Sequence, residues 1–241
     1  MMKHTLGKTH CLGLCGLVGL ALVLGTFGGN VRADESKAAP KFAKILFLGN
    51  SITLHGPSKK IGWEGNWGMA ASKLENDYVH IVVRSLAKSS GMTPKTMVKN
   101  IAALERQYAT YDLRKNLKDA FAFKPDLVVL AIGENVPKLE SAEAKAQFQA
   151  SVEKLLKEVK SDYDPTIIVR SCFWPDPAKD AALRQACQQA GGVFVDISSL
   201  GKDEANYARS ERDFQHAGVA AHPGDRGMQA IAEAIVKVLQ P

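Results

Sequence analysis

The fold is decided by Lys44-Ile-Leu-Phe-Leu-Gly-Asn-Ser-Ile-Thr53, a short apolar run followed by a turn. The run is typical of a buried strand, and Gly49 ends it. Ser51 lies in the turn two residues later. Near the C-terminus, Ala221-His-Pro-Gly-Asp225 places His222 just before a helical pattern. Because a serine hydroxyl is a weak nucleophile that needs a base within hydrogen-bond reach, this pair predicts nucleophilic hydrolysis.

Apolar runs alternate with amphipathic helical patterns along the rest of the chain. Asp126–Ile132 is the strongest strand pattern, and Ser141–Lys160 is the clearest helix pattern. Five such runs between helices predict a three-layer α/β/α sandwich around a parallel sheet, whose ligands bind beyond the carboxyl ends of the strands. The expected strands are 45–48, 96–101, 126–132, 166–169 and 193–197, and the expected helices are 69–86, 102–117, 141–160, 177–190 and 228–239.

The first 33 residues are typical of a secretory signal peptide. A basic start precedes the apolar segment 11–27, and Val31-Arg-Ala33 supplies a cleavage site. A membrane anchor is the alternative, but this Gly-rich segment is barely long enough to span a bilayer. We therefore expect a secreted or periplasmic protein with no stable membrane anchor after cleavage. The expected parts are a signal peptide (1–33), a flexible leader (34–41) and one domain (42–241).

Charge and cysteine content narrow the classes of partner. The formal net charge is +6, but Lys3, Lys8 and Arg32 belong to the signal segment, which holds no acid, so the mature chain carries +3. Nucleic acid is not an expected partner, because no Lys/Arg block is interleaved with aromatic residues. Cys172 and Cys187 should lie at opposite ends of one layer, too far apart for a disulfide. We expect no metal site, since no Cys/His cluster has zinc-ligand spacing.

Hydrolysis at a serine also needs hydrogen-bond donors for the oxyanion that forms. Gly49 and Asn50 build the turn that presents Ser51, and the N–H groups of this turn point the same way. Gly133-Glu134-Asn135 follows the third expected strand, where Asn135 could present its amide as a donor.

Three blocks in this order resemble the SGNH hydrolases, also called GDSL-type esterases. The resemblance covers nearly the whole mature chain and implies a flavodoxin-like sandwich with five parallel strands and no cofactor. It also implies that Ser51 is the nucleophile, that His222 is the base and then the acid, and that Asn135 and the Ser51 N–H bind the oxyanion. The blocks are Gly49-Asn50-Ser51-Ile52-Thr53, Gly133-Glu134-Asn135 and His222-Pro223-Gly224-Asp225-Arg226-Gly227-Met228.

The acid that usually orients the histidine is missing from this pattern. Val219 stands three residues before His222, where the family usually has Asp. A backbone carbonyl near Val219 could hold the ring instead, or Asp213 could reach it. Glu134 is a third candidate, although we expect it to be a solvated loop acid. Asp213 also lies three residues before His216, but His216 lacks the Pro and the helix start that follow His222.

A second departure concerns the remaining oxyanion donor. Ala102 follows the second expected strand where the family has glycine, and its N–H could still serve; Gly68 is the alternative.

Arg170, at the end of the fourth strand, is expected to pair with an acid. Trp63 and Trp67 lie in a polar, Gly-rich segment that is typical of a sugar- or acyl-binding loop, although buried packing is the usual fate of such side chains.

These observations together predict an exported serine esterase that acts on a small-molecule or carbohydrate ester, with O-acetyl groups as a candidate. Two other functions fit the same residues. One is a binding module with weak or no catalysis, and the other is an acyltransferase that uses the same Ser–His pair. The oligomeric state is not predicted.

Overall fold

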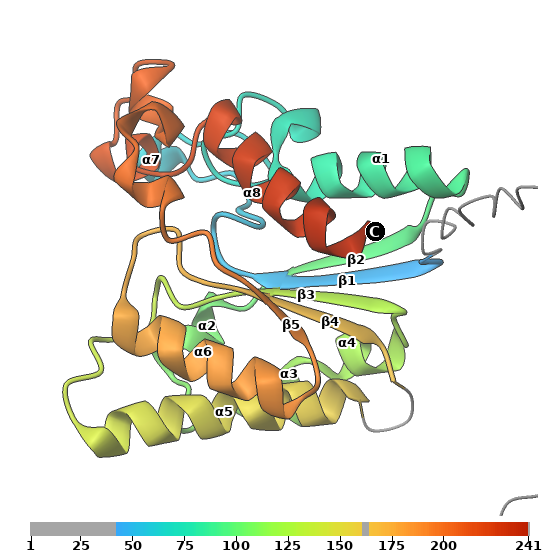
Figure 1. The fold of residues 1–241 in the computed structure, drawn as a ribbon. Helices are drawn as coiled ribbons and strands as arrows, with labels where there is room; N and C mark the ends of the chain where they lie inside the picture. Colours follow the sequence, from blue (N-terminus) through green and yellow to red (C-terminus); the bar gives the residue numbers. More distant parts are fainter. Residues whose placement is uncertain (1–41, 161–163, 241) are drawn as a thin grey trace, which may run out of the picture. The chain divides into compact units, whose positions relative to one another are not determined.

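A five-stranded, all-parallel sheet forms the centre of the fold (Figure 1). The computed structural model describes residues 42–160 and 164–240, so the predicted signal peptide and leader lie outside the described residues. The strand order is β2-β1-β3-β4-β5, as in flavodoxin-like folds. The strands are β1 (Lys44–Gly49), β2 (Lys95–Asn100), β3 (Leu127–Ala131), β4 (Thr166–Arg170) and β5 (Val193–Val195).

Helices cover both faces of this sheet, which confirms the predicted three-layer sandwich. Figure 1 shows α1 and α8 over one face and α5 and α6 over the other. Within 42–160 and 164–240, no helix combines the length and apolar character needed to cross a bilayer. The helices are α1 (Tyr78–Ser90), α2 (Ala102–Arg106), α3 (Leu113–Asn116), α4 (Lys118–Ala122), α5 (Ala142–Lys160), α6 (Pro177–Gln189), α7 (Ala217–Ala220) and α8 (Asp225–Leu239).

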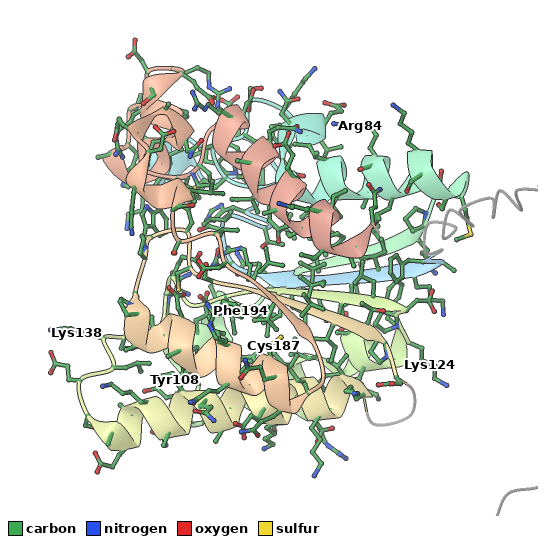
Figure 2. The ribbon with its side chains drawn as sticks, viewed as in Figure 1. Arg84, Tyr108, Lys124, Lys138, Cys187 and Phe194 are labelled. Atoms are coloured by element: carbon green, nitrogen blue, oxygen red, sulfur yellow. The ribbon has the colours of Figure 1, made fainter. Side chains whose placement is uncertain are left out.

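The sequence of β1 is apolar without alternation because both faces of the strand are covered. Leu46 and Leu48 belong to the core that α5 and α6 cover, whereas Ile45 and Phe47 belong to the core under α1 and α8. All four side chains are fully buried. A central strand of a parallel sheet needs such a run because its side chains point alternately to two covered faces. Cys187 of α6 joins the first of these cores as a buried free thiol (Figure 2).

The expected helix 69–86 begins later than its apolar pattern indicates. Asp77 caps α1 by accepting the His80 N–H at 2.8 Å. Ser72, which precedes this cap, donates to the Asp225 carboxylate through both its N–H and its hydroxyl. The segment before α1 therefore contains only a short 3-10 turn (Leu74–Asn76) and is tied to the start of α8.

The expected helix 102–117 is divided into α2 and α3. Asp112 starts α3 by accepting the Lys115 N–H at 3.0 Å. Tyr108, in the turn between the two helices, packs edge-to-face on Phe148 of α5 with 5.4 Å between ring centroids (Figure 2). The apolar stripe that predicted one helix is therefore buried without a continuous helix.

The carboxyl end of β1 is too closely packed for any residue but glycine. The Gly49 carbonyl accepts the Ile101 N–H at 2.6 Å. A Cβ atom on Gly49 would overlap the Thr53 hydroxyl oxygen. Thr53 cannot turn away easily, because it is fully buried and its hydroxyl lies 2.7 Å from that of Tyr78.

Gly49→Ala should therefore destabilise the fold by about 1–3 kcal/mol, the usual cost of overpacking. Urea unfolding measures this free energy. Gly56→Ala is the matched control, because the nearest atom to its new Cβ is 3.8 Å away, and it should change stability by less than about 0.5 kcal/mol. Equal effects of the two substitutions would contradict the packing argument.

Candidate active site

Ser51 lies in a turn that Asn50 organises. The Asn50 carbonyl accepts the N–H groups of Thr53 at 3.0 Å and Leu54 at 2.9 Å, and its Oδ1 accepts the Ile52 N–H at 3.1 Å. The Ser51 N–H, by contrast, has no hydrogen-bond acceptor among the residues that the structure describes. It is therefore free to bind a ligand beside the Ser51 hydroxyl.

His222 lies in hydrogen-bond contact with Ser51, although 171 positions separate them in the chain. Its Nε2 is 2.8 Å from Ser51 Oγ, and its Nδ1 is 2.7 Å from the Gly218 carbonyl oxygen. Since a carbonyl can only accept, Nδ1 carries the proton and Nε2 keeps a lone pair for the hydroxyl. The Gly218 carbonyl therefore holds the ring in the tautomer that a general base needs.

Asp213, Val219 and His216 do not hydrogen-bond to the His222 ring. Asp213 is exposed, and Gly218 already occupies the ring nitrogen that an orienting acid would contact. Val219 is buried in a small apolar cluster with Trp63 and Met69. His216 caps α7, where its Nδ1 accepts the Gly218 N–H at 3.1 Å.

Glu134 is buried in an ion pair, so the expectation that it is a solvated loop acid was wrong. Its Oε1 lies 2.6 Å from Arg170 Nη1, and both side chains are almost completely buried. This contact confirms that Arg170 pairs with an acid. Burial opposes ionisation of Glu134, but Arg170 and hydrogen bonds from the Phe173 N–H and the Asn50 amide outweigh it and lower the pKa of Glu134.

Glu105 of α2 is a second buried acid, and no motif in the sequence points to it. It accepts hydrogen bonds from Asn50 Nδ2 at 3.2 Å, the Gly133 N–H at 2.6 Å, and the N–H and Nδ2 of Asn135 at 3.1 and 2.8 Å. Burial and the charge of Glu134 raise the pKa of Glu105, while these donors favour its ionised form. The only signal in the sequence is its place just after the second strand.

The Asn135 amide is held on both sides. Its Nδ2 donates to Glu105, and its Oδ1 accepts from Arg106 Nη2 at 3.1 Å. These partners fix the orientation of the amide, because a carboxylate only accepts and a guanidinium only donates. The second N–H of the amide is not needed by Glu105, and Asn135 lines the same pocket as Ser51 and His222.

That pocket has a volume of about 360 Å³ and mixes apolar and polar side chains. Within the residues that the structure describes, no group of three or more His, Cys, Asp or Glu side chains is arranged to hold a metal ion. The pocket is lined by Ser51, His55, Ile61, Met69, Asn100, Ala102, Arg106, Asn135, His216, Gly218, Val219 and His222.

Three backbone positions were predicted to shape the site, and the N–H group of each already donates a hydrogen bond within the protein. The Ala102 N–H donates to Asn100 Oδ1 at 2.9 Å, and the Gly68 N–H donates to Asp77 Oδ2 at 3.1 Å. The Gly133 N–H donates to Glu105, and the φ angle of 129° at Gly133 favours glycine.

The two tryptophans that were predicted to bind substrate pack against each other. Trp63 and Trp67 meet edge-to-face with 5.6 Å between ring centroids, and the described lining of the pocket includes neither. The Trp63 indole N–H donates to the His55 carbonyl, and that of Trp67 donates to the Ala71 carbonyl. Both rings therefore have a packing role, and their contact with substrate stays a prediction.

Arg170→Met should lower the free energy of unfolding by about 3–5 kcal/mol, because it leaves the Glu134 carboxylate buried without a cation. Arg114→Met is the matched control: this arginine is 79% exposed, and loss of its pair with Glu158 should cost less than about 1 kcal/mol. Urea unfolding compares the two variants. Adding Glu134→Gln to Arg170→Met should restore part of the stability, and a further loss of stability would contradict this account of the pair.

Comparison with known proteins gives the family. The sequence model of the GDSL-like Lipase/Acylhydrolase family matches residues 47–230, more than half of the chain. No curated protein matches the chain significantly.

Three solved structures illustrate the likeness in fold. A protein described as a GDSL-like lipase from Bacteroides ovatus is 14% identical with a TM-score of 0.54, over 83% of this chain and 99% of that one. A similar protein from Bacteroides uniformis is 12% identical with a TM-score of 0.52, over 81% and 94%. A family two carbohydrate esterase from Clostridium thermocellum, in complex with cellohexaose, is 20% identical with a TM-score of 0.50, over 84% and 66%. The predicted resemblance is thus confirmed, and the chain belongs to the GDSL-like lipase/acylhydrolase family of ester-bond hydrolases.

Proposed function

We propose that this protein is an exported serine esterase that removes short acyl groups, such as acetyl, from a carbohydrate through an acyl-enzyme on Ser51. The observation that carries the proposal is the 2.8 Å contact between Ser51 Oγ and His222 Nε2 at the wall of the pocket. The likeness to a carbohydrate esterase supports the substrate class. Export is supported by the N-terminal sequence alone.

Acylation would begin at the Ser51 hydroxyl. Its proton passes to His222 Nε2 as Oγ attacks the carbonyl carbon of the ester. The imidazolium that forms keeps its Nδ1–H bonded to the Gly218 carbonyl. His222 then gives the proton to the leaving alcohol oxygen, which leaves the acyl group on Ser51. In the second half, water gives a proton to His222 and attacks the acyl carbon. His222 then returns this proton to Ser51 Oγ as the bond between Oγ and the acyl carbon breaks, and the acid product departs.

Two donors are free to stabilise the oxyanion in both halves. They are the Ser51 N–H and the second N–H of the Asn135 amide, whose orientation Glu105 and Arg106 fix. The alternatives at Ala102 and Gly68 already donate to side chains. Two preorganised donors of this kind are worth several orders of magnitude in rate.

Among the described residues no acid hydrogen-bonds to the His222 ring, and the cost is limited in this arrangement. Where an acid sets the tautomer of the base, its loss lowers kcat by about 10⁴-fold. Here the Gly218 carbonyl sets the tautomer, and the charge of Glu134 favours the imidazolium by raising the pKa of His222. The missing contribution is therefore only that of an acid bonded directly to the ring. A working Ser–His pair without a third side chain is therefore consistent with the geometry.

Ser51→Ala should lower the turnover of p-nitrophenyl acetate by at least about 10³-fold, because it removes the oxygen that would form the acyl-enzyme. Ser199→Ala is the control, since this exposed serine starts a short turn without a capping side-chain bond. Labelling by a fluorophosphonate should likewise disappear only in Ser51→Ala. An active Ser51→Ala protein would refute the assignment, and acyl transfer to an added sugar in preference to water would favour an acyltransferase.

The pH profile should reflect the environment of His222. Burial of the ring lowers the pKa of His222, against the raising effect of the Gly218 carbonyl. Because the base acts when neutral, kcat/KM should rise with pH and reach half its plateau below about 6.5, the ordinary value for histidine. Asp213→Asn should leave this midpoint and the plateau unchanged. A drop of several hundred-fold in Asp213→Asn would instead make Asp213 the orienting acid.

A further inference from the structure

The pocket carries a positive charge that the proposed hydrolysis does not require. Arg106 is the one permanently charged residue in its described lining, which contains no Asp or Glu. The nearest buried acids are engaged elsewhere, since Glu134 pairs with Arg170 and both oxygens of Glu105 accept hydrogen bonds. Lys59 and Lys60, both exposed, belong to the turn that contributes Ile61 to the pocket.

Arg106 also has unused hydrogen-bond donors. The side chain is exposed, and its Nη2 donates to Asn135 Oδ1 at 3.1 Å. A guanidinium carries five N–H groups, so most of them remain for a ligand. Arg114 and Arg209, by contrast, each lie within 3.1 Å of a carboxylate. Within the described part of the chain, no carboxylate lies at ion-pair distance from Arg106.

The hydrogen bond to Asn135 places this free charge close to the proposed reacting centre. Asn135 lines the pocket with Ser51 and is a proposed oxyanion donor, so the guanidinium lies one side chain away from the ester carbonyl. An anionic group on the same sugar as the ester could therefore reach Arg106. A planar guanidinium binds a carboxylate through two parallel hydrogen bonds, which a neutral hydroxymethyl group cannot replace.

We propose that Arg106 makes the site selective for acyl esters of acidic sugars, those that carry a carboxylate beside the esterified ring. This inference rests on the proposed function and names its substrate class. The carboxylate binds the free N–H groups of Arg106 while the ester carbonyl faces Ser51. Selectivity is then a difference in affinity for two esters that differ only in one charge.

The test uses two matched substrates, a mono-O-acetylated methyl glucuronoside and the corresponding methyl glucoside. At low ionic strength, wild-type kcat/KM should favour the charged ester by at least about tenfold, the effect of one charge-assisted contact. The preference should shrink as salt is added, because the guanidinium is exposed and its charge is screened.

Arg106→Gln keeps an amide donor for Asn135 but removes the charge, so the ratio of the two kcat/KM values should fall to about one. Both esters should be slowed to some degree, because Asn135 loses a charged partner; the ratio is therefore the readout. Arg106→Lys should retain part of the preference, whereas Arg106→Glu should reverse it. Arg114→Gln, which removes a cation that does not line the pocket, should leave the ratio unchanged.

Two failures are distinguishable. Efficient hydrolysis of the neutral ester with no preference for the charged one, or a preference that survives Arg106→Gln, would overturn the role of Arg106 alone. Failure to hydrolyse both esters and p-nitrophenyl acetate, with no fluorophosphonate labelling, would overturn the proposed function and this inference with it.

Discussion

The site depends on the buried ion pair between Glu134 and Arg170. Arg170 ends β4, and Glu134 follows β3, so their contact ties two strand ends together. Asn50, just after β1, donates to Glu134 and also to Glu105, which lies in α2 after β2. The carboxyl ends of four strands are thereby joined by polar contacts. A buried charge that loses its partner is strongly unfavourable, so this cluster fixes how the strand ends, and the turns that follow them, are placed.

The same cluster explains a residue choice in the serine turn. Asn50 lies between the carboxylates of Glu105 and Glu134. A third carboxylate there would repel both, since like charges close together in a buried site disfavour ionisation. The neutral amide instead donates one hydrogen bond to Glu105 and one to Glu134, and its oxygen still accepts the Ile52 N–H. The turn around Ser51 is thus adapted to the two acids beneath it.

The sheet and the approach of Ser51 to His222 could be predicted because they follow from local patterns. Buried strands read as apolar runs, and the carboxyl ends of parallel strands gather on one edge. The contacts that hold the site could not be predicted in this way. The burial of Glu134 depends on Arg170, 36 positions away, and Glu105 gains its importance only from the turn that it meets in space. The ring of His222 is held by the Gly218 carbonyl. The missing acid at Val219 made a nearby backbone carbonyl one of several candidates, but no side-chain pattern selects it.

Because a main-chain oxygen orients His222, the contact does not depend on a side chain at position 218 but depends on the local backbone. A carboxylate partner can be lost by one substitution, but the Gly218 carbonyl is present whatever side chain occupies position 218. Its position, however, depends on α7, a four-residue helix anchored by the buried Val219 and the His216 cap. Short elements of this kind open at a lower free energy than whole domains. The alignment of the His222 ring therefore depends on a short local element and not on the sheet itself.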